Sequence, residues 1–140
     1  MCGPPVASDY VLDCSALVDV LVGTDDTARE LQHGIRGMRL HAPYLLEAEM
    51  GQVLRRYVRA GVVDAVTAHG FLRGMRHMLA ERYPHDSLLD VAWGLRHSVS
   101  FYDALYVALA ARLDLPLLTT DHKLANTPGG LPCSIEPASS

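Results

Sequence analysis

The sequence predicts an α/β protein in which helices flank a central parallel β-sheet. Short apolar segments of strand length alternate with longer segments whose apolar residues recur every three or four positions, as on one face of a helix. Two of the short segments also stop at an aspartate. Strands that alternate with helices are typical of parallel sheets. The pattern predicts about four strands and six helices, but it does not predict the order of the strands.

The first half of the chain is expected to form two strands and three helices. Their expected ranges are 10–13 (strand), 15–21 and 25–35 (helices), 39–42 (strand) and 45–60 (helix). Pro43 closes the second strand and suits the first turn of the helix that follows. Gly61 suits the C-terminal end of that helix, because glycine readily adopts the left-handed conformation found there.

The second half is expected to form three helices and two strands. Their expected ranges are 64–80, 86–97 and 100–113 (helices), and 117–120 and 133–135 (strands). Asp64 is a suitable cap for the first of these helices. Leucines recur at four-residue spacing in the third helix, which Asp114-Leu115-Pro116 should terminate.

Length and composition indicate an ordinary soluble domain. The 140 residues predict a single domain over 1–140, with a core over about 9–136. Apolar residues make up 49% of the chain and charged residues 20%, and the net charge is −4. A protein that coats nucleic acid through bulk charge would be basic, so this class is disfavoured. Any phosphate contact would need a local basic patch or bound metal ions.

The chain has an odd number of cysteines, and no two of them have C-x-x-C spacing: they are Cys2, Cys14 and Cys133. They predict reduced thiols rather than a disulfide framework or a zinc site. No apolar run approaches the ~20 residues that a membrane span needs. We therefore expect a cytoplasmic protein without a membrane partner.

Four carboxylates are candidates for one metal site. Asp13 and Asp121 each follow a predicted strand, and ligand sites in open parallel sheets lie beyond the carboxyl ends of the strands. Asp103 falls in the first turn of an apolar helix, and Glu49 lies beside apolar Met50 in another. Each acid alone has an ordinary explanation as a cap, a turn residue or a solvated helix position. Together they offer the hard oxygen ligands that Mg²⁺ or Mn²⁺ prefers.

Four segments containing these acids follow one another in a recognisable order. They are YVLDCSAL at 10–17, APYLLEAE at 42–49 followed by VLRR at 53–56, FYDALYVALA at 101–110, and PLLTTD at 116–121. The chain therefore resembles the PIN-domain ribonucleases, and within them the VapC-type toxins of bacterial toxin–antitoxin pairs. The segment around Asp103 and the Thr-x-Asp at Thr119 and Asp121 are the most specific parts of the resemblance.

The resemblance implies a PIN-like three-layer sandwich with a central parallel β-sheet. It implies a Mg²⁺-dependent endoribonuclease, with Mn²⁺ as a possible substitute, that leaves 5′-phosphate and 3′-hydroxyl ends. The acids implied to be catalytic and to bind the metal are Asp13, Glu49, Asp103 and Asp121. The hydroxyls of Ser15 and Thr119 would fix the carboxylates, although ordinary turn bonding remains open for both. The implied partners are RNA, a small cognate antitoxin and a second copy of the chain.

The second acid has a competitor, because Glu47 also lies close to its position in the family pattern. The spacing from Pro43 and to Val53-Leu54 favours Glu49. The family often has Asn three residues after this acid, where this chain has Gln52. That departure bears on a side-chain contact beside the site rather than on the acid.

RNA contacts are expected from basic side chains near the acids. The candidates are Arg55, Arg56, Arg82, His122 and Lys123, with His85 as a further contributor. Solvated surface charge is the ordinary alternative for each of them.

Three other functional classes are weighed as alternatives. A PIN-fold module without catalytic activity would usually lack one or more of the acids, and this chain has all four. An aspartyl-phosphate phosphatase would need a second Asp two residues after Asp13, where Ser15 stands, and the adjacent acids of a receiver domain are absent near the start. A DNA nuclease of related fold would normally be a longer chain.

Overall fold

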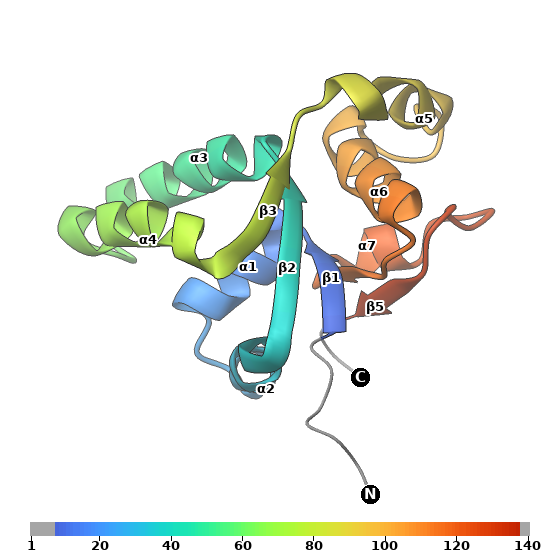
Figure 1. Cartoon of the computed structure of the whole chain (residues 1–140). Helices are drawn as coiled ribbons and strands as arrows, with labels where there is room; N and C mark the ends of the chain where they lie inside the picture. Colours follow the sequence, from blue (N-terminus) through green and yellow to red (C-terminus); the bar gives the residue numbers. More distant parts are fainter. Residues whose placement is uncertain (1–7, 138–140) are drawn as a thin grey trace, which may run out of the picture.

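The computed structural model describes residues 8–137, which form a five-stranded sheet in the order β3-β2-β1-β4-β5 (Figure 1). The strands are β1 (Ser8–Leu12), β2 (Met38–Pro43), β3 (Leu79–Tyr83), β4 (Leu117–Thr119) and β5 (Ile135–Pro137). All four pairings are parallel, and Val11 of β1 lies opposite His41 of β2 and Leu117 of β4. The carboxyl ends of the strands therefore share one edge of the sheet.

Helices cover both faces of this sheet. They are α1 (Cys14–Val22), α2 (Asp26–Gly34), α3 (Leu45–Arg59), α4 (Ala65–Met78), α5 (Leu89–Gly94), α6 (Phe101–Leu113) and α7 (His122–Ala125), with 3₁₀ turns at Ile35–Gly37 and Asp86–Leu88. Figure 1 shows α1 to α4 on one side of the sheet and α5 and α6 on the other. The predicted three-layer α/β sandwich is confirmed.

The core forms where α6 lies across the sheet. Every residue of α6 from Ala104 to Ala110 is buried, and the helix contacts β1, β2 and β4. A helix that is buried on all sides needs no polar face, which explains its apolar sequence. Ser100 caps it by accepting a hydrogen bond from the Asp103 N–H at 3.1 Å. The packing of α6 fixes the position of Asp103 at its first turn.

Most of the predicted elements are present, and the clearest error is at β3. The helix predicted to reach residue 80 ends at Met78, and Leu79–Tyr83 form an edge strand that was not predicted. Pro43 belongs to β2 rather than to the first turn of α3, because the adjoining Tyr44 N–H bonds the Tyr83 carbonyl at 2.8 Å. The helix expected to reach residue 97 ends at Gly94, and the short helix α7 was not predicted.

Several smaller expectations can also be checked. Asp64 caps α4 as predicted, and Gly61 has the positive φ of 76° expected after α3. Cys14 and Cys133 are free thiols, and Cys2 lies outside the described residues. Within residues 8–137, none of the helices has both the length and the apolar character needed to cross a bilayer.

Candidate active site

Asp13 lies directly after β1 and caps α1. Its carboxylate accepts hydrogen bonds from the Ala16 N–H at 3.0 Å, the Ser15 hydroxyl at 2.7 Å and the Thr119 hydroxyl. Its exposed fraction is 4%. A carboxylate has about four lone-pair directions, so three bonds leave roughly one for a ligand in the adjoining cavity.

The hydroxyls of Ser15 and Thr119 connect Asp13 to the neighbouring strand. Ser15 accepts a hydrogen bond from the Thr120 N–H at 3.1 Å, and Thr119 accepts one from the Asp121 N–H at 3.0 Å. The two hydroxyl oxygens are 3.2 Å apart. These contacts hold the end of β1 against the end of β4, where Asp121 follows.

Asp121 and Asp103 are each positioned by a helix N-terminus. One carboxylate oxygen of Asp121 caps α7 by accepting from the Lys123 and Leu124 N–H groups at 2.9 and 3.2 Å. Asp103 lies in the first turn of α6 and is partly buried. The free N–H groups at the start of α7 thus hold Asp121 in place, and the start of α6 sets the position of Asp103.

Glu49 reaches the same region from α3. Its Oε1 accepts a hydrogen bond from the Tyr106 hydroxyl at 2.5 Å. Glu47, the competing acid, is paired with Arg82 instead. The sequence reasoning missed Tyr106, although it follows Asp103 by three residues and such pairs share one face of a helix. That spacing was the signal that could have identified it.

A cavity of about 400 Å³ brings the four predicted acids together. Asp13 and Asp121 approach it from strand ends, Glu49 from α3 and Asp103 from α6. Its other lining residues include Ser15, Asp19, Arg56, Tyr57, Tyr106 and Thr120. The acids are separated along the chain by up to 108 positions, so the fold alone assembles them.

The carboxylates interact electrostatically as a group. The pKa of Asp13 is raised to about 6, mainly by burial and to a smaller extent by the charge of Asp103, against the lowering effect of its three hydrogen bonds. Burial also raises the pKa of Glu49, with Asp103 adding to the shift. The pKa of Asp103 is raised by burial and then by Asp121. Asp103 therefore interacts with each of the other three acids.

This arrangement fits a hydrated divalent cation. Clustered ionised carboxylates are costly without a positive charge among them. Within residues 8–137, no group of three or more His, Cys, Asp or Glu side chains is already arranged to hold a metal ion. Mg²⁺ usually keeps several waters and binds one or two carboxylates directly. The cavity and its oxygen donors suit that mode, with the remaining acids acting through water.

Two of the predicted basic residues lie beside the acids. Arg56 lines the carboxylate cavity, and Lys123 lines a neighbouring cavity of about 230 Å³ together with Asp103 and Asp121. Arg55 lies in the groove between α3 and α4. Arg82 is committed to Glu47, and His122 lines neither of the two cavities.

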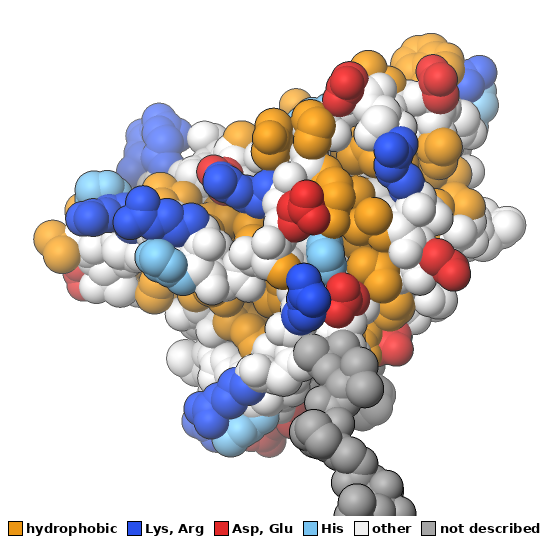
Figure 2. Space-filling model, in the orientation of Figure 1, with side chains coloured by type: hydrophobic (Ala, Val, Ile, Leu, Met, Phe, Trp, Pro, Cys, Tyr) orange, Lys and Arg blue, Asp and Glu red, His pale blue; other side chains and the backbone are white. Residues whose placement is uncertain are grey.

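A local basic region exists despite the net negative charge. Figure 2 shows basic side chains, in blue, gathered over the part of the molecule formed by α3 and α4. These two helices carry Arg55, Arg56, Arg59, Arg73 and Arg76. His85, the further candidate, bonds the Leu45 N–H through Nε2 at 3.0 Å and so helps to fix the start of α3.

Comparison with known proteins gives consistent matches over most of the chain. The PIN domain family matches residues 10–130. Ribonuclease VapC1 of Mycobacterium tuberculosis strain H37Rv is 45% identical over 129 residues, which cover 91% of this chain and 96% of that protein.

Two solved structures share the fold. PAE2754 from Pyrobaculum aerophilum has a TM-score of 0.63 and 28% sequence identity, covering 93% of this chain and 85% of its own. VapBC-5 of Mycobacterium tuberculosis, a member of the VapBC family of toxin–antitoxin systems, has a TM-score of 0.63 and 23% identity. The match covers 93% of this chain and 98% of the VapBC-5 chain, and at this identity it is evidence of fold alone.

Proposed function

The chain belongs to the PIN-domain family, and within it to the VapC ribonucleases, and we propose that it is a Mg²⁺-dependent endoribonuclease. We further propose that it is the toxin of a toxin–antitoxin pair. The observation that carries the proposal is the cavity in which Asp13, Glu49, Asp103 and Asp121 meet from four separate elements. A non-catalytic role for the fold would not require all four acids to converge.

The proposed reaction is hydrolysis of an RNA phosphodiester. Asp13, Asp103 and Asp121 would hold a divalent cation directly or through water, and Glu49 would bind it or orient the attacking water. When bound, the cation would supply Lewis-acid chemistry, activating water and offsetting negative charge on the phosphate. Mn²⁺ has similar ligand preferences and would be a substitute. Water adds to phosphorus as the bond to the 3′-oxygen breaks, which leaves a 5′-phosphate and a 3′-hydroxyl.

The protein groups around the acids would position them for this reaction. Ser15 and Thr119 donate hydrogen bonds to Asp13, which fix the orientation of its carboxylate beside the cavity. Tyr106 restrains Glu49 in the same way. Among the basic candidates, Arg56 and Lys123 are the best placed to bind RNA phosphates because each lines a cavity beside the acids. We assign no RNA contact to Arg82, whose guanidinium is paired with Glu47.

The decisive experiment compares cleavage of total RNA by the wild-type protein and by Asp103→Asn. We expect Mg²⁺-dependent cleavage by the wild type and a loss of about 100-fold or more in the variant, because it removes the charge that interacts with all three other acids. Asp26→Asn is the matched control, because that side chain is 97% exposed and lies outside the cavity. Cleavage by the wild type in excess EDTA, or by Asp103→Asn at the wild-type rate, would disprove the mechanism.

We also propose two protein partners. A small antitoxin would bind over the carboxylate cavity and block it, in keeping with the VapBC-5 toxin–antitoxin system, whose fold this chain shares. A homodimer is the second proposal, supported by exposed apolar side chains such as Leu89, Val91 and Trp93 on α5. Light scattering of the purified chain tests the dimer, and a uniform monomer mass would reject it. RNA and antitoxin partners both imply action in the cytoplasm.

A further inference from the structure

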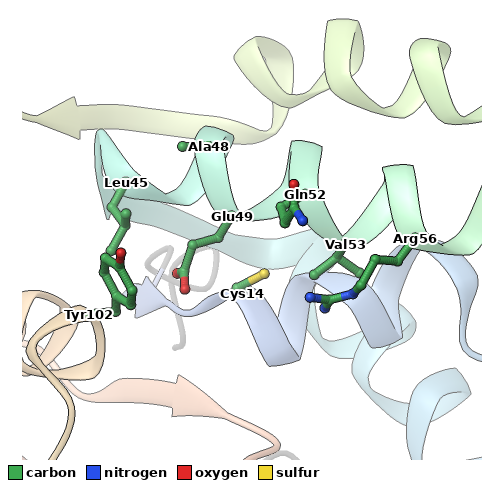
Figure 3. Close-up of a pocket in the computed structure, with 8 residues that line it drawn as sticks. All are labelled: Cys14, Leu45, Ala48, Glu49, Gln52, Val53, Arg56 and Tyr102. Atoms are coloured by element: carbon green, nitrogen blue, oxygen red, sulfur yellow. The ribbon is translucent and has the colours of Figure 1, made fainter.

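A second cavity adjoins the carboxylate cavity and has no role in the proposed function. Its volume is about 350 Å³, and its lining residues are Cys14, Leu45, Ala48, Glu49, Gln52, Val53, Arg56 and Tyr102 (Figure 3). Cys14, Glu49, Val53 and Arg56 line both cavities. A ligand in the second cavity would therefore lie next to the atoms that act on the phosphodiester.

The walls of this cavity suit a flat aromatic group. Leu45, Ala48 and Val53 form an apolar side along α3, and Tyr102 lies across from Leu45 at one end (Figure 3). Tyr102 is 61% exposed at the start of α6. An exposed aromatic ring beside an apolar wall offers a stacking surface that every nucleobase can use.

The polar groups of the cavity suit the rest of a nucleotide. Gln52 carries an amide, which presents both a hydrogen-bond donor and an acceptor and can therefore distinguish base edges. Figure 3 shows Arg56 at the opposite end from Tyr102, with Glu49 and Cys14 between them. Arginine pairs well with phosphate oxygens. A side chain that can stack on a base and one that can bind a phosphate thus lie at the two ends of one cavity.

A third cavity also adjoins the carboxylate cavity. It shares Asp103 and Asp121 with the carboxylate cavity and adds Lys123 together with the hydroxyls of Ser98, Ser100 and Thr127. No aromatic side chain lines it, so its chemistry suits phosphate and ribose rather than a stacked base. The carboxylate cavity thus shares residues with both of the other cavities, and only the cavity beside Tyr102 offers a surface for stacking a base.

We propose that the cavity beside Tyr102 binds one nucleobase of the RNA substrate, in the nucleotide next to the phosphate that is cleaved. Tyr102 stacks on the base, Gln52 contacts its edge and so contributes to base choice, and Arg56 binds the adjoining phosphate. This inference rests on the proposed ribonuclease function and assigns the part of the site that selects the substrate. An RNA base is favoured over a protein side chain because the cavity is continuous with the phosphate-cleaving region.

The test for stacking uses short RNAs around a cleavage site mapped by sequencing the ends of cleaved RNA. Each RNA carries one abasic nucleotide, at successive positions on both sides of the scissile bond. The wild type should lose about tenfold in affinity at one of these positions, measured by fluorescence anisotropy in EDTA so that no cleavage occurs. Tyr102→Ala should bind the intact and abasic RNAs equally, whereas Tyr102→Phe should behave as the wild type.

Tyr44→Ala is the matched control, because Tyr44 is also an exposed tyrosine, at 55%, and lies outside the cavity. It should keep the wild-type loss at the abasic position. Tyr102→Ala with the same abasic penalty as the wild type would overturn the proposal.

The test for base choice uses Gln52→Ala on an RNA library randomised around the mapped site. The variant should lose the base preference at the position found in the abasic scan and keep the preferences elsewhere. An unchanged preference at that position would overturn the role of Gln52. Failure of the wild type to cleave any RNA would instead reject the proposed function and this proposal with it, whereas cleavage at a mapped site with an unchanged abasic penalty in Tyr102→Ala would overturn the base-binding role alone.

Discussion

At the scale of single residues, the clearest tension is at Asp13, which is buried yet has a carboxyl group that must ionise to bind a cation. Burial raises its pKa to about 6 in the folded protein, against a usual value of 3.8. The folded protein therefore binds this proton more tightly than the unfolded chain does. The free energy of unfolding should fall as the pH rises from about 4 to about 6, by roughly 3 kcal/mol, and remain lower above that range.

Because the ionised carboxylate of Asp13 lowers the free energy of unfolding, Asp13→Asn should stabilise the metal-free protein while abolishing cleavage. In EDTA at pH 7.5 the variant should unfold at a higher temperature than the wild type, because it removes a buried charge. The difference should disappear near pH 4, where Asp13 of the wild type is protonated. Thermal unfolding followed by circular dichroism measures the difference at both pH values. Added Mg²⁺ should raise the unfolding midpoint of the wild type more than that of the variant. A variant less stable than the wild type at pH 7.5 would contradict the prediction.

Tyr106 is predicted to act through Glu49 rather than on the substrate. Tyr106→Phe keeps the buried ring but removes the hydrogen bond to the carboxylate, so kcat should fall by about tenfold while KM is unchanged. Tyr83→Phe is the control, because it also removes a hydroxyl that bonds its neighbours, His41 and Glu81, but away from the cavity. Equal loss of kcat in both variants would indicate a general structural effect.

The acids could be identified from the sequence more readily than the groups that hold them. Asp13 and Asp121 follow apolar strand segments, and Asp103 follows a capping serine, so each has a local signal. The Tyr106 to Glu49 bond joins residues 57 positions apart, and no local pattern shows that α3 and α6 bring them together. The cavity beside Tyr102 likewise depends on side chains of α3 and of the start of α6 that are distant in the sequence.

At the scale of secondary structure, β3 shows why an edge strand is difficult to predict. Only Leu79 is buried among its five residues, and Glu81 and Arg82 are exposed, so the segment lacks an apolar run. The helical periodicity of α4 also leads directly into it. What makes it a strand is its pairing with β2, which lies about 40 residues earlier and is invisible to local propensity.

Gly23 is predicted to be required where α1 ends and the chain turns toward α2. A Cβ at this position would lie 2.5 Å from the Ala28 Cβ and 2.5 Å from the Asp19 carbonyl oxygen. Gly23→Ala should therefore lower the free energy of unfolding by about 1–3 kcal/mol. Gly37→Ala is the matched control, because its Cβ would meet no atom within 4 Å. Urea denaturation measures both, and equal stabilities of the two variants would refute the role of Gly23.

At the scale of the whole molecule, we propose that residues 9–136 form one domain and predict that they unfold in one cooperative step. The central strand β1 pairs with β2 from the first half of the chain and β4 from the second, and α6 contacts all three. Neither half can keep its core without the other. When the protein is heated without denaturant at a fixed concentration, the calorimetric and van't Hoff enthalpies of unfolding should therefore agree. Two separate transitions would contradict a single domain.

The pairing of β1 with β4 also sets when the proposed activity can arise during protein synthesis. Asp13 is translated 108 residues before Asp121, and its bond to Thr119 spans 106 positions. At 5–20 residues per second, the ribosome needs about 5–20 s to cover that interval. Until β4 has left the ribosome, the nascent chain contains the first acid but no complete active site. The chain therefore cannot have the proposed activity before β4 is in place, and the proposed antitoxin could be made within that interval.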